Sequence, residues 1–238
     1  MATGEIKVMY LAPLVVGRTH PEFRARWRQH ADLAMGLGFW KYMSRYKQCD
    51  VLTAGEEGLP EDLLAHFRTA DYGGVGQIYF HDAEALGATL SETDDVQTMC
   101  VDEVPTFGRE LGVNLTGVVQ SEVIPGAPGP ITVIGAVHRV AGMDRETFSK
   151  KWLELGQEVA RRPELASRVN RYVHNDAFPE AEYCDGFVEL SFADVDNLLA
   201  FMGAMQESGL AEAENEFMDR SKMEAVITRE TLLYDVVD

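Results

Sequence analysis

The chain has 238 residues, of which 46% are hydrophobic and 25% are charged, a composition typical of a globular protein that buries a sizeable core. Its formal net charge of −18 argues against nucleic acid and anionic membrane surfaces as partners. The sequence has no apolar run of about 18 residues, so we expect no transmembrane helix. Three scattered cysteines without a CxxC pair favour reduced thiols and a cytoplasmic location.

The first half of the chain predicts a strand, a helix, two strands, a helix and a strand. Thr19 and Glu22 form a capping-box pattern at the start of the first helix, which ends near Gly36 and Gly38. The strands are predicted at 6–16, 39–52, 76–82 and 116–124, and the helices at about 20–37 and from 82 onward. Residues 53–75 predict a loop, or a lid, with a short helical piece, while residues 98–107 show no clear pattern.

A proline- and glycine-rich stretch at 126–130 divides the chain into domains at 1–125 and 131–238. The second domain repeats the order of the first. Its strands are predicted at 131–140, 169–177, 186–192 and 224–235, and its helices from Asp144 and at 193–205.

The first helices of the two halves share a spacing. Read at 3.6 residues per turn, Phe23, Trp27, His30, Ala31 and Ala34 lie on one face of the first helix. In the second half, Phe148 and Trp152 each follow their counterparts by 125 residues, and the same offset takes His30 to Leu155, with Val159 completing the apolar face. A histidine therefore stands where the repeat has a plain apolar residue.

These patterns predict a duplicated βαββαβ unit and an α+β fold. One such ferredoxin-like unit forms a four-stranded antiparallel sheet with two helices on one face. Because the opposite face is apolar, we expect two fused units to pack sheet to sheet. The result would be an intramolecular dimeric α+β barrel with its helices outside.

The residues that carry a family resemblance are the F-x-x-x-W-x-x-H helix of FRARWRQHADL (23–33) and the strand VNRYVHNDA (169–177). The chain resembles the EthD-like members of the dimeric α+β barrel (ferredoxin-like) superfamily over most of its length. The resemblance implies a pocket between sheet and helices, faced by His30 in the first half and by Tyr172, Asn175 and Asp176 in the second. It also implies one working pocket, in the first half, because the second helix lacks the histidine.

Two kinds of residue predict chemistry in that pocket. An imidazole with a near-neutral pKa is suited to proton transfer, so His30 is the candidate general acid/base, although a core histidine bonded to a backbone carbonyl or water stays open. Tyr46 and Tyr42 are the candidate donors to an enolate oxygen. Tyr172 recurs at the position of Tyr42, which favours a structural role for Tyr42, while Tyr46 has no counterpart.

The remaining candidates would line the pocket and bind substrate. They are Tyr10, Trp40, Tyr79, Tyr172, His174, Asn175 and Asp176. The histidines show no metal-ligand spacing, and the glycines at 73, 74 and 76 lead into a strand rather than into a helix, so we expect neither a metal nor a nucleotide cofactor.

The leading hypothesis is a cofactor-independent lyase or isomerase, catalysing dehydration, cyclisation or lactone rearrangement of a small ring-containing apolar substrate. The family implies an aromatic or polyketide-like molecule as the partner, and a homodimer stays open. The alternatives are a cofactor-free monooxygenase, a haem-binding protein with His30 as ligand, and a non-catalytic small-molecule-binding pseudo-dimer.

Overall fold

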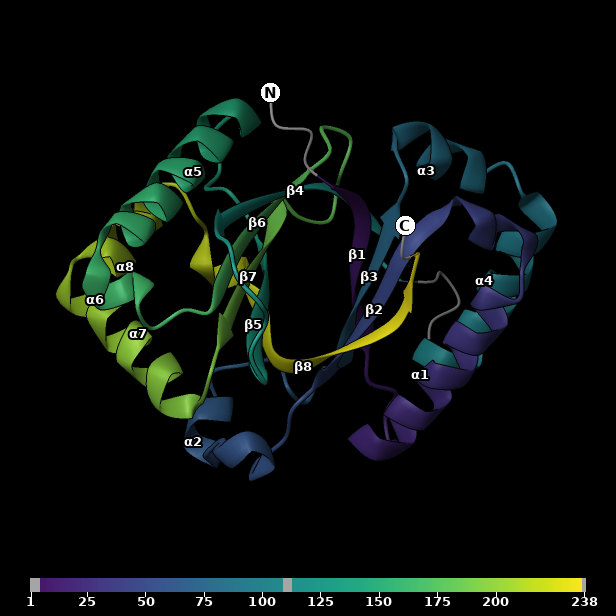
Figure 1. Cartoon of the computed structure of the whole chain (residues 1–238), viewed down its shortest axis with the longest axis horizontal. Helices are drawn as coiled ribbons and strands as arrows, with labels where there is room; N and C mark the ends of the chain where they lie inside the picture. The colour runs from purple at the N-terminus through teal and green to yellow at the C-terminus, as the bar shows by residue number, and fades with distance from the viewer. Residues whose placement is uncertain (1–4, 109–112, 237–238) are drawn as a thin grey trace.

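A closed eight-stranded barrel stands at the centre of the protein (Figure 1). The computed structural model describes residues 5–108 and 113–236. The strands follow one another around the barrel in the order β1-β3-β2-β8-β5-β7-β6-β4, and every neighbouring pair is antiparallel. Their bounds are β1 Ile6–Pro13, β2 Met43–Val51, β3 Tyr72–Phe80, β4 Thr116–Ile124, β5 Ile131–Val137, β6 Arg171–Ala177, β7 Gly186–Phe192 and β8 Glu224–Asp235.

Helices cover the barrel on two opposite sides (Figure 1). On one side lie α1, α3 and α4, which come from the first half of the chain, and on the other lie α5 to α8 from the second half. The helices are α1 His20–Met35, α2 Glu61–Leu64, α3 Ala83–Thr89, α4 Thr93–Phe107, α5 Arg145–Arg161, α6 Pro163–Ala166, α7 Val195–Glu207 and α8 Leu210–Ala213. Within the described ranges no helix is long and apolar enough to cross a membrane.

Helix α1 begins and packs as its sequence predicts. The backbone amide of Glu22 donates to the Thr19 hydroxyl, and the Glu22 carboxylate accepts from the Thr19 amide at 2.8 Å, which completes the capping box. This arrangement satisfies two amides that the first turn leaves without helical partners. The buried residues of α1 are those of the predicted face, Phe23, Trp27, His30, Ala31 and Ala34.

Two predicted elements differ from the structure. Residues 39–52 are not one strand, because a 3-10 helix at Gly38–Tyr42 precedes β2 and carries Tyr42. The patternless stretch 98–107 belongs to α4, a 15-residue helix with an internal Pro105. Its periodicity is hidden because Val101 and Val104 are exposed while Asp102 and Glu103 are half-buried.

The barrel interior holds a buried cluster of polar residues, which we call the Lys7 cluster, in addition to the expected apolar core. Lys7 is fully buried, and its ammonium group forms an ion pair of 2.7 Å with Glu189. The other partners of the Lys7 ammonium group are Gln77, Tyr79 and Gln120, at 2.8, 3.2 and 2.9 Å. Because Lys7 and Glu189 come from opposite halves of the chain, the cluster ties the two halves together inside the barrel.

Candidate functional site

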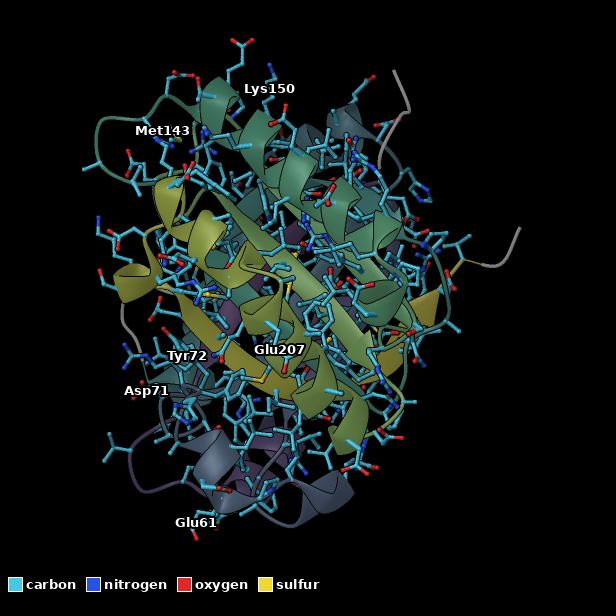
Figure 2. All side chains as sticks on the ribbon, turned by 90° about the vertical axis from the view of Figure 1, so that its left-hand side faces the viewer. Glu61, Asp71, Tyr72, Met143, Lys150 and Glu207 are labelled. Atoms are coloured by element: carbon cyan, nitrogen blue, oxygen red, sulfur yellow. The ribbon has the colours of Figure 1, made fainter. Side chains whose placement is uncertain are left out.

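A cavity of about 380 Å³ lies in the second half of the protein, between the outer face of the barrel sheet and helices α5, α7 and α8. Its walls are apolar and include Trp152 of α5, Leu190 of β7, and Phe201 and Met205 of α7. Residues 66–68, which follow α2, also line the cavity, from the first half of the chain. Figure 2 looks onto this side of the protein, with Glu61 of α2 below Glu207 of α7. The size and apolar lining of the cavity are typical of a small-molecule site.

One tyrosine lines this apolar space. Tyr172 of β6 lines the cavity, and its hydroxyl lies 2.8 Å from Nε2 of His174, two residues along the same strand. The His174 ring is stacked on Trp152, with centroids 4.1 Å apart and planes 19° apart. Both side chains are buried, so the tyrosine hydroxyl and the imidazole form a fixed hydrogen-bonded pair in the sheet face under α5.

Burial controls the protonation of this pair. Desolvation lowers the pKa of His174 to about 3, so the imidazole is neutral at neutral pH. Desolvation also raises the pKa of Tyr172, with a smaller contribution from the charge of Glu214. A neutral imidazole offers Nε2 as either an acceptor or a donor, depending on its tautomer. The pair is therefore uncharged at neutral pH. When Nε2 carries the proton, it donates to the tyrosine oxygen and leaves the tyrosine O–H free to donate to another group.

The geometry of this pair explains a glycine in α5. A Cβ atom at Gly156 would fall 2.8 Å from the His174 ring, so only glycine leaves room for the imidazole between helix and strand. At the offset of 125 residues, α1 has Ala31 at this place. A glycine inside a helix costs about 1 kcal/mol relative to alanine and indicates a packing reason. This was the signal in the sequence that could have pointed to His174.

The first half holds a matching pair with a different chemistry. The ring of Trp27 meets Gly74 as the ring of Trp152 meets Gly186, and the strand register places Asp50 and Asp176 opposite these glycines. Counting back along the strands, Tyr46 then corresponds to Tyr172 and Gln48 to His174. The Gln48 amide donates to the Tyr46 hydroxyl at 2.8 Å. The predicted correspondence of Tyr42 with Tyr172 is therefore wrong, because the 3-10 helix shifts the alignment.

His30 lies beside a carboxylate that the sequence analysis missed. Its Nδ1 is 2.7 Å from Oδ2 of Asp102 on α4, and Arg26 forms an ion pair of 2.5 Å with the other oxygen. Burial lowers the pKa of His30, while the hydrogen bond to Asp102 opposes that shift. His30 is not among the residues that line the cavity described above. Its catalytic role stays a prediction.

The other predicted residues lie in three different places. Tyr10 and Tyr46 meet under α1, with their hydroxyl oxygens 3.4 Å apart, and Trp40 packs edge-on against Tyr46. Tyr42 is half-buried and donates to Glu92 at 3.2 Å. The structure places the remaining predicted residues as follows: Tyr79 and Asn175 in the barrel interior around Lys7 and Glu189, and Asp176 under α5, where it accepts from Ser149.

Metal and haem ligands need side chains with free donor atoms. Among the described residues, no three His, Cys, Asp or Glu side chains gather to hold a metal ion. At the cavity, Nε2 of His174 is engaged by Tyr172 and the ring lies flat against Trp152, while His66 lies exposed at the mouth. A haem iron requires an axial ligand that points at it from the pocket wall. The described residues of this cavity do not fit a haem group.

Solved structures identify the fold. The chain is similar over its full length to a presumed monooxygenase from Fusobacterium nucleatum, with a TM-score of 0.54 and 7% identity over all of both chains. It is also similar to chlorite dismutase from Candidatus Nitrospira defluvii in complex with imidazole, with a TM-score of 0.54, 11% identity, and coverage of 97% of this chain and 92% of the other. No protein-family model and no curated protein matches the sequence. The protein therefore has the fold of the dimeric α+β barrel superfamily.

This comparison corrects the leading hypothesis from the sequence. A cofactor-independent lyase or isomerase was predicted, but solved structures that share this fold are named as monooxygenase and chlorite dismutase. The prediction is wrong on this evidence.

Proposed function

We propose that the protein is an oxygenase without a bound cofactor, and that it acts on a small apolar substrate in the cavity of its second half. The observation that carries this proposal is Tyr172 in the wall of an apolar cavity of about 380 Å³, with its hydroxyl bonded to the buried His174. The monooxygenase name of a structure with this fold supports the same reaction class.

We further infer that the two halves are ferredoxin-like repeats, because the strand orders β4-β1-β3-β2 and β8-β5-β7-β6 correspond.

The proposed reaction starts with the loss of a proton from a methylene group activated by neighbouring rings or a carbonyl. The proton leaves to solvent as the substrate enters the cavity, and the carbanion forms in its enolate form. The neutral Tyr172 hydroxyl, whose oxygen accepts from Nε2–H of His174, stabilises this enolate by donating a hydrogen bond to its oxygen. The carbanion then reduces O₂. One oxygen atom becomes the new carbonyl and the other leaves as water, so that CH₂ and O₂ give C=O and H₂O. The apolar walls exclude bulk water from the carbanion.

Removing the hydroxyl of the cavity-lining tyrosine tests this proposal. With anthrone as the probe, whose methylene lies between two aromatic rings, we expect the wild-type protein to consume O₂. Tyr172→Phe should lower the rate by about a hundredfold, because removing one donor to a developing oxyanion costs a factor of that order. An oxygen electrode measures the rate.

Tyr46→Phe is the matched control, since it removes the corresponding hydroxyl from the first half. It should change the rate by less than about threefold, within the effect of a small change in packing. Full turnover in Tyr172→Phe would rule out this cavity as the oxygenase site, and so would an equal loss in both variants.

Haem binding by the cavity is the competing hypothesis, and a titration with haemin tests it. Because the imidazole of His174 is engaged and that of His66 is exposed, we expect haemin titration to give no saturable shift of the Soret band. A saturable shift at one equivalent, lost in the His174→Gln variant, would show that the Tyr172–His174 bond opens for iron and would replace the oxygenase proposal.

A further inference from the structure

The mouth of the cavity carries charged side chains above its apolar walls. His66 and Arg68 lie on the segment after α2, while Glu214 and Arg220 lie on the 3-10 turns Glu214–Glu216 and Arg220–Lys222 that follow α8. Arg220 and Glu214 form a close ion pair with each other. This pairing leaves Arg68 as the cavity-lining guanidinium without a carboxylate partner among the residues that line the cavity.

Arg68 is held in place by its backbone rather than by its side chain. Its amide donates to the carbonyl of Ala225 at 2.8 Å, which ties the segment to β8, and its carbonyl accepts from the amides of Asp71 and Tyr72. Figure 2 shows Asp71 and Tyr72 on the same side of the molecule as Glu207, which ends α7. The side chain forms an ion pair with Asp71 at 3.6 Å, and both groups are more than half exposed.

We propose that the cavity takes an apolar monocarboxylic acid, with its hydrocarbon part among the aromatic and methionine walls and its carboxylate on Arg68. This inference deepens the proposed function, since it names the substrate class of the same cavity. An exposed ion pair contributes little to stability, so Arg68 can exchange Asp71 for a ligand carboxylate at small cost. Arginine suits this role because its planar guanidinium binds carboxylates with two parallel hydrogen bonds.

The negative charge of the whole protein supports the role of Arg68 in binding a carboxylate. A net charge of −18 repels anions from most of the surface. An anionic ligand therefore needs local positive charge at its binding site, and Arg68 supplies it beside the one opening that leads to apolar walls. A carboxylate at the mouth also keeps its contact with water, so binding avoids the cost of burying a charge.

Two probes that differ only in the head group test the inference. Decanoate, kept below its micellar concentration, and decanol are compared by their displacement of a polarity-sensitive fluorescent dye from the full chain. We expect decanoate to bind about tenfold more tightly than decanol at low salt, with the difference shrinking as salt is added. Arg68→Gln should remove the preference by weakening decanoate alone, and Arg68→Lys should keep part of it.

Arg161→Gln is the control, because Arg161 lies at the exposed end of α5 and does not line this cavity. Equal affinity for the two probes, or an Arg68→Gln variant that keeps the preference, would overturn the head-group inference and leave the oxygenase proposal standing. Failure of both probes to displace the dye would overturn both. Circular dichroism on each variant confirms that the fold is retained.

Discussion

Lys7→Met should lower the free energy of unfolding by about 3–5 kcal/mol, the cost of leaving a buried charge without its partner. Lys7 is fully buried, and Glu189 is 3% exposed. Burial alone would raise the pKa of Glu189, but the ion pair and hydrogen bond with Lys7 hold it well below its usual range. With methionine in place of Lys7, the carboxylate must either stay charged in the barrel interior or take up a proton. Urea denaturation followed by circular dichroism measures the change.

Two comparisons separate this effect from a general cost of substitution. Lys41→Met removes an ammonium group that pairs with Glu92 at 2.8 Å at the surface, and it should cost less than about 1 kcal/mol. The double variant Lys7→Met with Glu189→Leu removes both charges. Since apolar replacements of a whole buried pair are often neutral, it should be more stable than Lys7→Met alone. A Lys7→Met protein as stable as Lys41→Met would show that the Lys7 cluster contributes nothing to stability.

The sequence could predict α1 but not α4, for a physical reason. In α1 the apolar residues recur at helical spacing between a capping box and two glycines, so local pattern and tertiary packing agree. In α4 only Thr106 and Phe107, at its C-terminal end, are buried. Val101 and Val104 are exposed while Asp102 and Glu103 are half-buried, so the apolar residues do not mark the inner face of the helix. Asp102, the carboxylate beside His30, belongs to that helix, so its contact with the imidazole could not be predicted from the sequence.

The barrel interior was equally hard to predict. A lysine in the strand IKVMYL is read as a solvent-facing residue, because charged side chains are rarely buried without partners. The partners of Lys7 come from β3, β4 and β7, up to 182 residues away in the sequence, and only the closed barrel brings them together. The sequence predicted an apolar inner face for the barrel and missed the Lys7 cluster that lies there beside the apolar core.

The location of the cavity depends on register rather than on residue type. The sequence analysis favoured the first half because His30 stands where α5 has Leu155. In the structure, the buried imidazole that bonds to the cavity-lining Tyr172 belongs to His174 on strand β6. This position corresponds to that of Gln48 on β2 in the first half. One 3-10 helix before β2 was enough to hide this match, since it shifts the alignment of the strands relative to the helices.

His174→Gln should change how the stability of the protein depends on pH. The pKa of His174 is about 3 in the folded protein and about 6.5 in the unfolded chain, so the unfolded state binds the extra proton between these values. The stabilisation that belongs to the neutral, buried imidazole is therefore present above pH 6.5 and is lost as the pH falls toward 3. From pH 7 to pH 4, this loss amounts to about 3 kcal/mol.

Glutamine at position 174 copies Gln48, which bonds its tyrosine at the same 2.8 Å without a titrating group. The free energy of unfolding of His174→Gln should therefore fall less between pH 7 and pH 4 than that of the wild type, by about the 3 kcal/mol of one buried histidine. Tyr172→Phe keeps the imidazole and should keep the steep dependence. Urea denaturation at each pH measures all three proteins. Parallel curves for the wild type and His174→Gln would show that the imidazole takes up its proton without unfolding the chain.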